Sequence, residues 1–130
     1  KGAYFADVFQ KSFGYCRDNA QADDTSYKLL LLCEVALGEM LELNDAQYIT
    51  QLPHPYKSTK GMGTTGPSLK QSVVLANGAK VPCGRLRNYK YDHLNAPRSL
   101  NYNEYIVYDT TQIKMRYLVQ TRDYGGGFWQ

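Results

Sequence analysis

The sequence predicts an α+β fold that is mostly antiparallel sheet, with one or two short helices. Three observations lead to this prediction. Residues 27–37 contain a continuous apolar run of strand type, residues 72–81 flank an Asn77-Gly78 turn, and residues 102–108 alternate in polarity. A chain of 130 residues is long enough for one domain with a real core, but not for two.

The N-terminal part is predicted to contain a strand, a helix and a second strand. The strand ends near Phe5, and a helix capped by Asp7 continues to Cys16, because apolar residues recur there at helical spacing. Residues 17–26 are polar and are interpreted as a loop. Residues 27–37 are expected to form a central strand buried on both faces, with a buried helix as the alternative.

The rest of the chain is predicted to alternate between irregular connections and short strands. Residues 44–67 are interpreted as irregular, with one helical turn at most, because they are rich in proline and glycine. The hairpin at 72–81 follows, and residues 84–99 are expected to form a long basic loop. Strands are predicted at 102–108 and 113–120, before a flexible glycine-rich tail.

Composition restricts the class of protein. The net charge of +3 fits an anionic ligand without requiring one, and no apolar run approaches the length of a membrane span. Nothing at the N-terminus resembles a signal peptide. Cys16, Cys33 and Cys83 are odd in number and far apart, which argues against a disulfide framework or a zinc site and favours a reducing compartment.

Four stretches share an order and spacing with one known family. They are residues 1–7 (KGAYFAD) with the nearby Lys11-Ser12 and Tyr15-Cys16, residues 34–38 (EVALG), residues 57–63 (KSTKGMG) and residues 102–108 (YNEYIVY). From residue 1 to about residue 119 the chain resembles the catalytic domain of poly(ADP-ribose) polymerases, in particular the DNA-damage-dependent branch. The resemblance implies a split antiparallel β core that binds NAD+ in an extended, bent conformation.

The resemblance also implies catalytic residues. Tyr4 and Glu104 stand at the tyrosine and the glutamate of the family's His-Tyr-Glu triad, and Lys11 is placed near the glutamate on the acceptor side. The triad histidine belongs to a His-Gly motif upstream of these residues, and neither His54 nor His93 is followed by glycine. We therefore expect residues 1–130 to be the C-terminal part of a single ADP-ribosyltransferase catalytic domain, inactive without its N-terminal part.

Further residues are assigned by the resemblance to binding of the nicotinamide end of NAD+. Tyr15 is expected to stack on the nicotinamide ring, and Ser12 to hydrogen-bond its carboxamide. Ala6 is expected to form a small wall of the pocket, beside Tyr4. The family uses NAD+ as substrate, and no metal is expected.

The function implied is the formation of poly(ADP-ribose) on protein acceptors with release of nicotinamide, in the nuclear response to DNA damage and in DNA repair. DNA would be contacted only through domains outside these 130 residues, and no membrane is involved. One alternative is a catalytically incomplete module that binds NAD+ or ADP-ribose. Another is a structural half that needs a partner segment.

Without the resemblance, each residue has a simpler interpretation. Glu104 would be a solvated strand residue, Ser12 an ordinary helix residue, and Tyr4 and Tyr15 core residues. Gly61-Met62-Gly63 is interpreted as a turn, since a lone Gly-x-Gly is a weak phosphate-loop signal. The basic, aromatic residues 85–91 are interpreted as a solvated loop, with polymer or nucleic-acid contact as the alternative.

Overall fold

The computed structural model describes residues 1–16, 19–20, 26–89 and 97–122. These residues form an α+β fold of mixed sheets with one α-helix, α1 (Phe9–Tyr15). The strands are β1 (Ala3–Phe5), β2 (Asn19–Ala20), β3 (Ser26–Val35), β4 (Met40–Leu43), β5 (Ser58–Gly61), β6 (Gly63–Pro67), β7 (Val73–Val74), β8 (Lys80–Val81), β9 (Leu86–Asn88), β10 (Leu100–Tyr102), β11 (Glu104–Val107) and β12 (Ile113–Arg122). Two 3₁₀ turns, η1 (Leu69–Gln71) and η3 (Thr110–Gln112), complete the order. No helix in the described ranges is long and apolar enough to cross a membrane.

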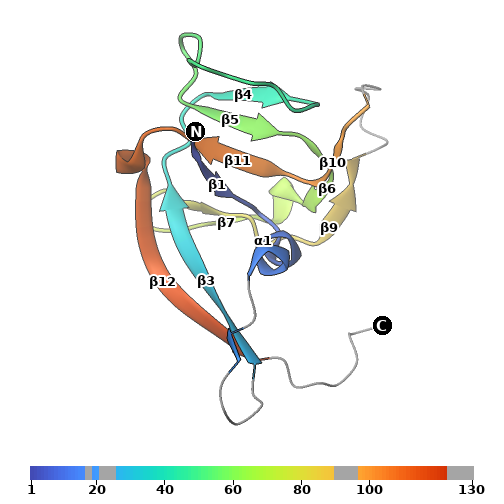
Figure 1. Ribbon diagram of the computed structural model, residues 1–130, viewed down its shortest axis with the longest axis vertical. Coiled ribbons are helices and arrows are strands. Elements are labelled where there is room, and N and C mark those ends of the chain that lie inside the picture. Colours follow the sequence, from blue (N-terminus) through green and yellow to red (C-terminus); the bar gives the residue numbers. More distant parts are fainter. Residues whose placement is uncertain (17–18, 21–25, 90–96, 123–130) are drawn as a thin grey trace.

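The central sheet has four strands in the order β1-β11-β5-β4 (Figure 1). Strand β11 is antiparallel to both of its neighbours, whereas β4 is parallel to β5. The two inner strands, β11 and β5, are each hydrogen-bonded to a neighbouring strand on both sides. The two edge strands, β1 and β4, are each hydrogen-bonded on one side. The central sheet therefore fixes the backbone of β11 from both sides.

A second sheet continues directly from the central one, in the order β10-β6-β9. Met62 alone separates β5 from β6, and Asn103 alone separates β10 from β11. Strand β10 runs parallel to β6, but β11 runs antiparallel to β5. Asn103 therefore lies where the chain passes from one sheet to the other, so the single strand expected over 102–108 is in fact two.

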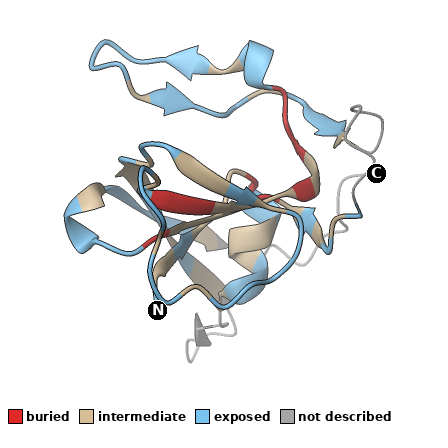
Figure 2. Cartoon of the chain, turned by 90° about the horizontal axis from the view of Figure 1, so that it is seen from above, coloured by how far each residue is buried: buried red, intermediate tan, exposed pale blue. Residues whose placement is uncertain are grey.

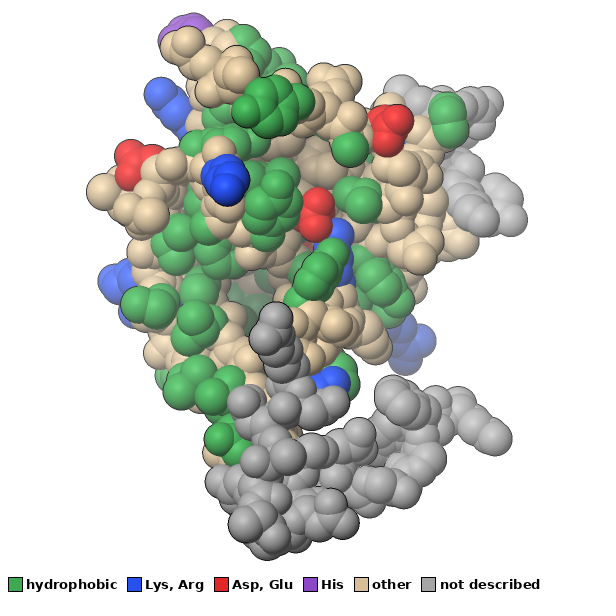
Figure 3. Space-filling model, in the orientation of Figure 1, with side chains coloured by type: hydrophobic (Ala, Val, Ile, Leu, Met, Phe, Trp, Pro, Cys, Tyr) green, Lys and Arg blue, Asp and Glu red, His purple; other side chains and the backbone are tan. Residues whose placement is uncertain are grey.

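Strands β12 and β3 form a long antiparallel ribbon to which β2 adds a third strand (Figure 1). The strands expected at 27–37 and 113–120 are thus confirmed. The expectation that the first is buried on both faces was wrong, because Leu31 is 58% exposed and Leu32 is 56% exposed. Hydrophobic side chains gather over this ribbon in Figure 3.

Buried residues lie in the central sheet and along β6 and the segment that follows it (Figure 2). Among the described residues the buried apolar side chains are Val8, Pro67 and Val107, and the buried polar ones are Ser58, Thr59, Ser68 and Asn103. The polar ones are hydrogen-bonded in several cases: Ser58 donates to the carbonyl of Leu37, and Thr59 shares a hydrogen bond with Tyr108. The buried residues of the sheets thus lie on β5, β6 and β11 and directly beside the ends of these strands.

The expected hairpin is confirmed as β7 paired with β8, with Gly78 at a positive φ of 84°. A positive φ suits glycine, because it lacks a Cβ atom. The expected irregularity of residues 44–67 was wrong for its second half, which forms β5 and β6. The long loop expected at 84–99 contains β9, and its residues 90–96 lie outside the described part, as does the glycine tail.

Candidate functional site

Glu104 and Lys11 meet on one face of the central sheet. Glu104 is the first residue of β11, and Lys11 lies on α1; the Nζ atom of Lys11 is 3.1 Å from Oε1 of Glu104. The two side chains are 12% and 21% exposed, so the pair is shielded but open to solvent on one side. The same Nζ atom also donates to the carbonyl of Tyr102 at 3.3 Å. A carboxylate held in this way can act on a molecule that arrives from the open side.

Tyr4 lies on the same face of the sheet as Glu104. In the pairing of β1 with β11, Tyr4 stands opposite Ile106, which is two residues after Glu104. Directly opposed residues share a face, and so do residues two apart on a strand. Tyr4 is 63% exposed, so it is a surface aromatic residue rather than the core residue that composition alone suggested.

The helix α1 presents its polar side toward Glu104. Lys11, Ser12 and Tyr15 lie one, three and four residues apart, which places them on one side of a helix. The opposite side carries Phe9 and Phe13, whose ring centroids are 5.3 Å apart. The amphipathic pattern thus turns the side of α1 that carries Lys11 toward the carboxylate.

Helix α1 is also joined to the β3 ribbon. The Nζ atom of Lys28 on β3 lies 4.1 Å from the ring centroid of Phe13, and the thiol of Cys16 donates to the carbonyl of Leu29. These contacts hold the aromatic side of the helix against β3. The orientation of Lys11 therefore depends on contacts to both the ribbon and the central sheet.

The other expected residues, Tyr15, Ser12 and Ala6, are not hydrogen-bonded to one another through their side chains. Tyr15 is 79% exposed at the end of α1, Ser12 is half-buried and its carbonyl accepts from the Cys16 thiol, and Ala6 is half-buried between β1 and α1. Tyr15 is therefore not a core residue either. His54 is exposed in a Pro-His-Pro segment, and His93 lies outside the described residues.

A polar network on the other side of β11 escaped the sequence analysis. Asp7 does not cap α1: the N-cap is Val8, which makes no side-chain cap hydrogen bond. The Oδ2 atom of Asp7 instead accepts from Nδ2 of Asn103 at 2.8 Å and from the hydroxyl of Tyr105 at 2.9 Å. The one signal in the sequence was an asparagine inside an otherwise alternating strand.

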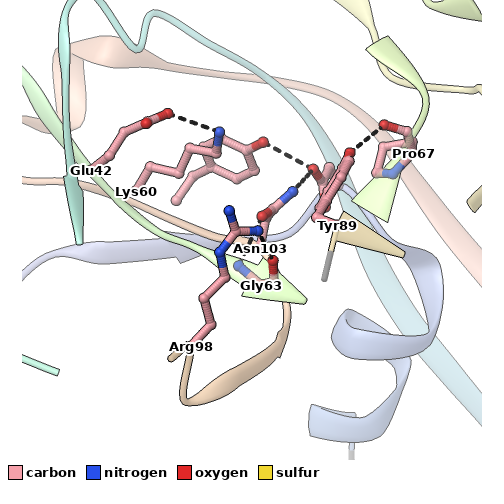
Figure 4. A network of polar contacts seen from close by, with 9 residues as sticks. Glu42, Lys60, Gly63, Pro67, Tyr89, Arg98 and Asn103 are labelled. Carbon is pink, nitrogen blue, oxygen red and sulfur yellow. Dashed lines mark hydrogen bonds and ion pairs between the residues drawn. The ribbon is translucent and has the colours of Figure 1, made fainter. Parts of the chain in front are cut away.

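Asn103 is the centre of this network (Figure 4). Its Oδ1 atom accepts from the backbone N–H of Gly63 at 3.0 Å, and the carbonyl of Gly63 accepts from Arg98 at 2.8 Å. Burial, and then the charge of Asp7 and the hydrogen bond to it, raise the pKa of Tyr105 far above its usual range. The phenol of Tyr105 is therefore a constant hydrogen-bond donor.

Comparison with known proteins identifies the family. The family model for the poly(ADP-ribose) polymerase catalytic domain matches residues 1–123. The chain belongs to this family. It is 45% identical over 130 residues to poly [ADP-ribose] polymerase 1 of Danio rerio, covering 99% of this chain and 12% of that relative. It is 46% identical over 123 residues to poly [ADP-ribose] polymerase 2 of Arabidopsis thaliana, covering 94% of this chain and 18% of that relative.

A third relative extends the range of organisms. Poly [ADP-ribose] polymerase of Drosophila melanogaster is 42% identical over 118 residues, which cover 91% of this chain and 11% of that relative. The chain thus spans less than a fifth of the length of these curated relatives. The match includes β11 with Glu104 and α1 with Lys11, both of which lie within residues 1–123.

Proposed function

We propose that this chain supplies the catalytic glutamate and the nicotinamide-binding side of an NAD+ ADP-ribosyltransferase that builds poly(ADP-ribose) on protein acceptors. The observation that carries the proposal is the shielded pair of Lys11 and Glu104 in a chain of the poly(ADP-ribose) polymerase family. Residues 1–130 would form the C-terminal part of the split β core of that catalytic domain.

The chemistry suits a single carboxylate. The bond that breaks joins the ribose C1′ atom to the nicotinamide nitrogen, and its electron pair returns to the positively charged ring, so the leaving group needs no acid. The ribose passes through an oxocarbenium-like state, as in glycoside hydrolysis. A nucleophilic oxygen of the acceptor then bonds to C1′ and gives up its proton.

Glu104 would act on both partners in this step. One carboxylate oxygen can hydrogen-bond a ribose hydroxyl of NAD+ and stabilise the developing positive charge, and the carboxylate can also receive the proton of the acceptor hydroxyl. Lys11 binds Oε1 at 3.1 Å, which orients the carboxylate and leaves Oε2 for these contacts. Elongation depends most on proton removal, because a ribose hydroxyl is a weak nucleophile.

The remaining residues of this face would bind the nicotinamide end of NAD+. Tyr15, exposed at the end of α1, would stack on the nicotinamide ring, and such stacking contributes about 0.5–1.5 kcal/mol beyond burial. Ser12 would bond the carboxamide, Ala6 would form a small wall, and Tyr4 would flank the ring from β1. All four lie in residues 4–15, so one short segment supplies this side of the pocket.

The wider biological role is part of the same proposal. Two of the relatives named above are poly [ADP-ribose] polymerases 1 and 2, and on this basis we assign the protein to the nucleus and to the DNA-damage response. DNA would be contacted by parts of the protein other than these residues. Protein acceptors and the growing polymer would approach the open side of the Lys11–Glu104 pair.

The test is polymer formation from labelled NAD+ by the full-length protein carrying Glu104→Gln. Polymer should disappear while some NAD+ hydrolysis or single-unit transfer remains, because glutamine keeps a hydrogen-bonding oxygen but cannot take a proton. The matched control is Glu42→Gln, which also breaks a lysine pair, the one with Lys60, and should leave polymer unchanged. Polymer at the parental level from Glu104→Gln would refute the role of Glu104.

The same assay separates the alternatives. A module that only binds NAD+ or ADP-ribose would bind labelled NAD+ and release no nicotinamide. A polypeptide limited to residues 1–130 should form no polymer, because it contains no His-Gly motif to bind the adenine-side ribose. A misplacement of about 1 Å can already cost roughly 100-fold in rate, so NAD+ held by one side alone should not react.

A further inference from the structure

The carboxylate of Asp7 joins the helix that carries Lys11 to the strand that carries Glu104. Its two hydrogen-bond donors, Asn103 at 2.8 Å and Tyr105 at 2.9 Å, are the residues immediately before and after Glu104. Asp7 itself lies four residues before Lys11, directly ahead of Val8, the N-cap residue of α1. One carboxylate oxygen therefore holds the backbone on both sides of Glu104 to the segment that leads into α1.

Asn103 presents its amide in a single orientation. Its Oδ1 atom is occupied by the N–H of Gly63, and its side chain is buried, with the residue only 3% exposed. A Cβ atom on Gly63 would overlap the backbone of Tyr102 and Asn103, so the two chain segments touch closely here. The amide nitrogen of Asn103 consequently points at Asp7 and cannot turn away without losing the bond to Gly63.

Tyr105, the residue that follows Glu104 in the sequence, donates the second hydrogen bond to Asp7. Because burial and the neighbouring carboxylate raise its pKa, the phenol stays protonated and donates at every physiological pH. Hydrogen bonds to an ionised acceptor are shorter and stronger than neutral ones. Two such bonds on one oxygen make the link between Asp7 and β11 resistant to movement.

Helix capping does not account for a carboxylate at this position. Asp7 gives no cap hydrogen bond to α1, and its second oxygen, Oδ1, is buried without a hydrogen-bond partner among the described residues. A buried oxygen without a partner costs free energy. The carboxylate thus has one buried oxygen without a partner, and within the described ranges its side-chain hydrogen bonds lead to the two neighbours of Glu104.

We infer that Asp7 is a positioning residue, which acts through Asn103 and Tyr105 to hold Glu104 within reach of Lys11. The inference rests on the function proposed above, because the position of Glu104 matters for activity only if Glu104 is the catalytic carboxylate. Asp7 is hydrogen-bonded to Asn103 and Tyr105, and not to Lys11 or Glu104. Its effect is to fix the strand and the helix relative to each other.

The first test measures position directly and needs no turnover. Crystal structures of the full-length protein with Asp7→Ala and with Tyr105→Phe should both show the Lys11 Nζ to Glu104 Oε1 distance increased from 3.1 Å to beyond about 4 Å. Tyr105→Phe keeps the ring and removes one bond, so it remains informative if Asp7→Ala does not fold. An unchanged 3.1 Å contact in the variants that fold would overturn the inference.

The second test asks whether Tyr105 acts through Glu104. In the parent protein, Tyr105→Phe should lower the rate of NAD+ hydrolysis about tenfold, the effect of losing one charge-assisted hydrogen bond. In the Glu104→Gln background the same change should have little further effect. Equal losses in both backgrounds would indicate a merely structural role and contradict the inference.

Two further variants complete the design. Asp7→Asn keeps an oxygen that accepts both hydrogen bonds and should retain more activity than Asp7→Ala. Tyr108→Phe removes a phenol hydroxyl that bonds Thr59 instead, and it should leave the Lys11–Glu104 distance unchanged. If Glu104→Gln proves fully active, the proposed function fails, and the crystallographic distances still decide whether Asp7 positions the pair.

Discussion

Lys11 and Lys60 are equally shielded lysines, 12% and 13% exposed, that bind carboxylates on opposite faces of the central sheet. Lys60 stands opposite Tyr105 in the register of β5 and β11, so it shares the face that Glu104 does not. Its partner is Glu42 on β4, at 3.0 Å. The two ion pairs are therefore alike in distance and in the burial of the lysine, but they occupy opposite faces, and Glu42 is 51% exposed whereas Glu104 is 21% exposed.

This likeness allows a controlled test of Lys11. Lys11→Met should reduce polymer formation at least about tenfold, because the carboxylate of Glu104 loses the cation that orients it. Lys60→Met should leave polymer formation unchanged and alter the free energy of unfolding by about 1 kcal/mol or less, as for other partly exposed pairs. Polymer yield from labelled NAD+ and chemical denaturation measure the two effects. Equal losses of polymer in both variants would remove Lys11 from the site.

Tyr15 offers a test of nicotinamide stacking that does not disturb the core. Because Tyr15 is 79% exposed, Tyr15→Ala should leave the thermal midpoint nearly unchanged while weakening the binding of NAD+ and of benzamide-type inhibitors. Tyr48, which is 94% exposed, is the matched control, and Tyr48→Ala should change neither property. Calorimetric titration with benzamide gives the affinities. Unchanged affinity in a folded Tyr15→Ala protein would exclude Tyr15 from the pocket.

Local patterns in the sequence predicted those elements that depend on local chemistry. The hairpin follows from the turn preference of Asn77-Gly78, and the ribbon strands follow from their apolar runs. Strands β5 and β6 were missed because their glycines were interpreted as signs of irregular structure, whereas they allow neighbouring segments to approach closely. A Cβ atom on Gly66 would come within 2.7 Å of Nδ2 of Asn103, so this glycine permits close approach of two segments within a sheet.

Long-range contacts account for the other differences. Asp7 was expected to cap the helix that follows it, but its carboxylate binds Asn103 and Tyr105, which are 96 and 98 residues away. No pattern in residues 5–16 can reveal those partners. The pairing of Lys11 with Glu104 was likewise expected only from the family resemblance, because the two residues are brought together by the packing of α1 beside the central sheet.

The three cysteines should differ in reactivity although all three are free thiols. Burial raises the pKa of Cys33, which lowers its thiolate fraction, whereas Cys83 is exposed. Alkylation of the native protein should therefore modify Cys83 before Cys33, as followed by peptide mass mapping. Under denaturing, non-reducing conditions these residues should contribute three titratable thiols. Fewer than three would contradict both the free state and the inference of a reducing compartment.

Tyr105 should make stability sensitive to alkaline pH. Its pKa is raised in the folded protein, whereas a tyrosine in the unfolded chain titrates near about 10. Below that pH both states hold the proton and the contribution of Tyr105 is complete. Above it the unfolded chain loses the proton first and binds fewer protons than the folded protein, so the free energy of unfolding falls as the pH rises further.

Denaturant unfolding of the parent protein and of Tyr105→Phe between pH 8 and pH 11 isolates this effect. The stability advantage of the parent should be constant up to about pH 10 and should shrink above it, because phenylalanine has no proton to lose. Tyr108→Phe is the control, since Tyr108 is a more exposed residue than Tyr105 and its hydroxyl bonds Thr59 rather than a carboxylate. An advantage that stays constant through pH 11 would mean that Tyr105 titrates alike in both states, and that the phenol is not held as a donor to Asp7.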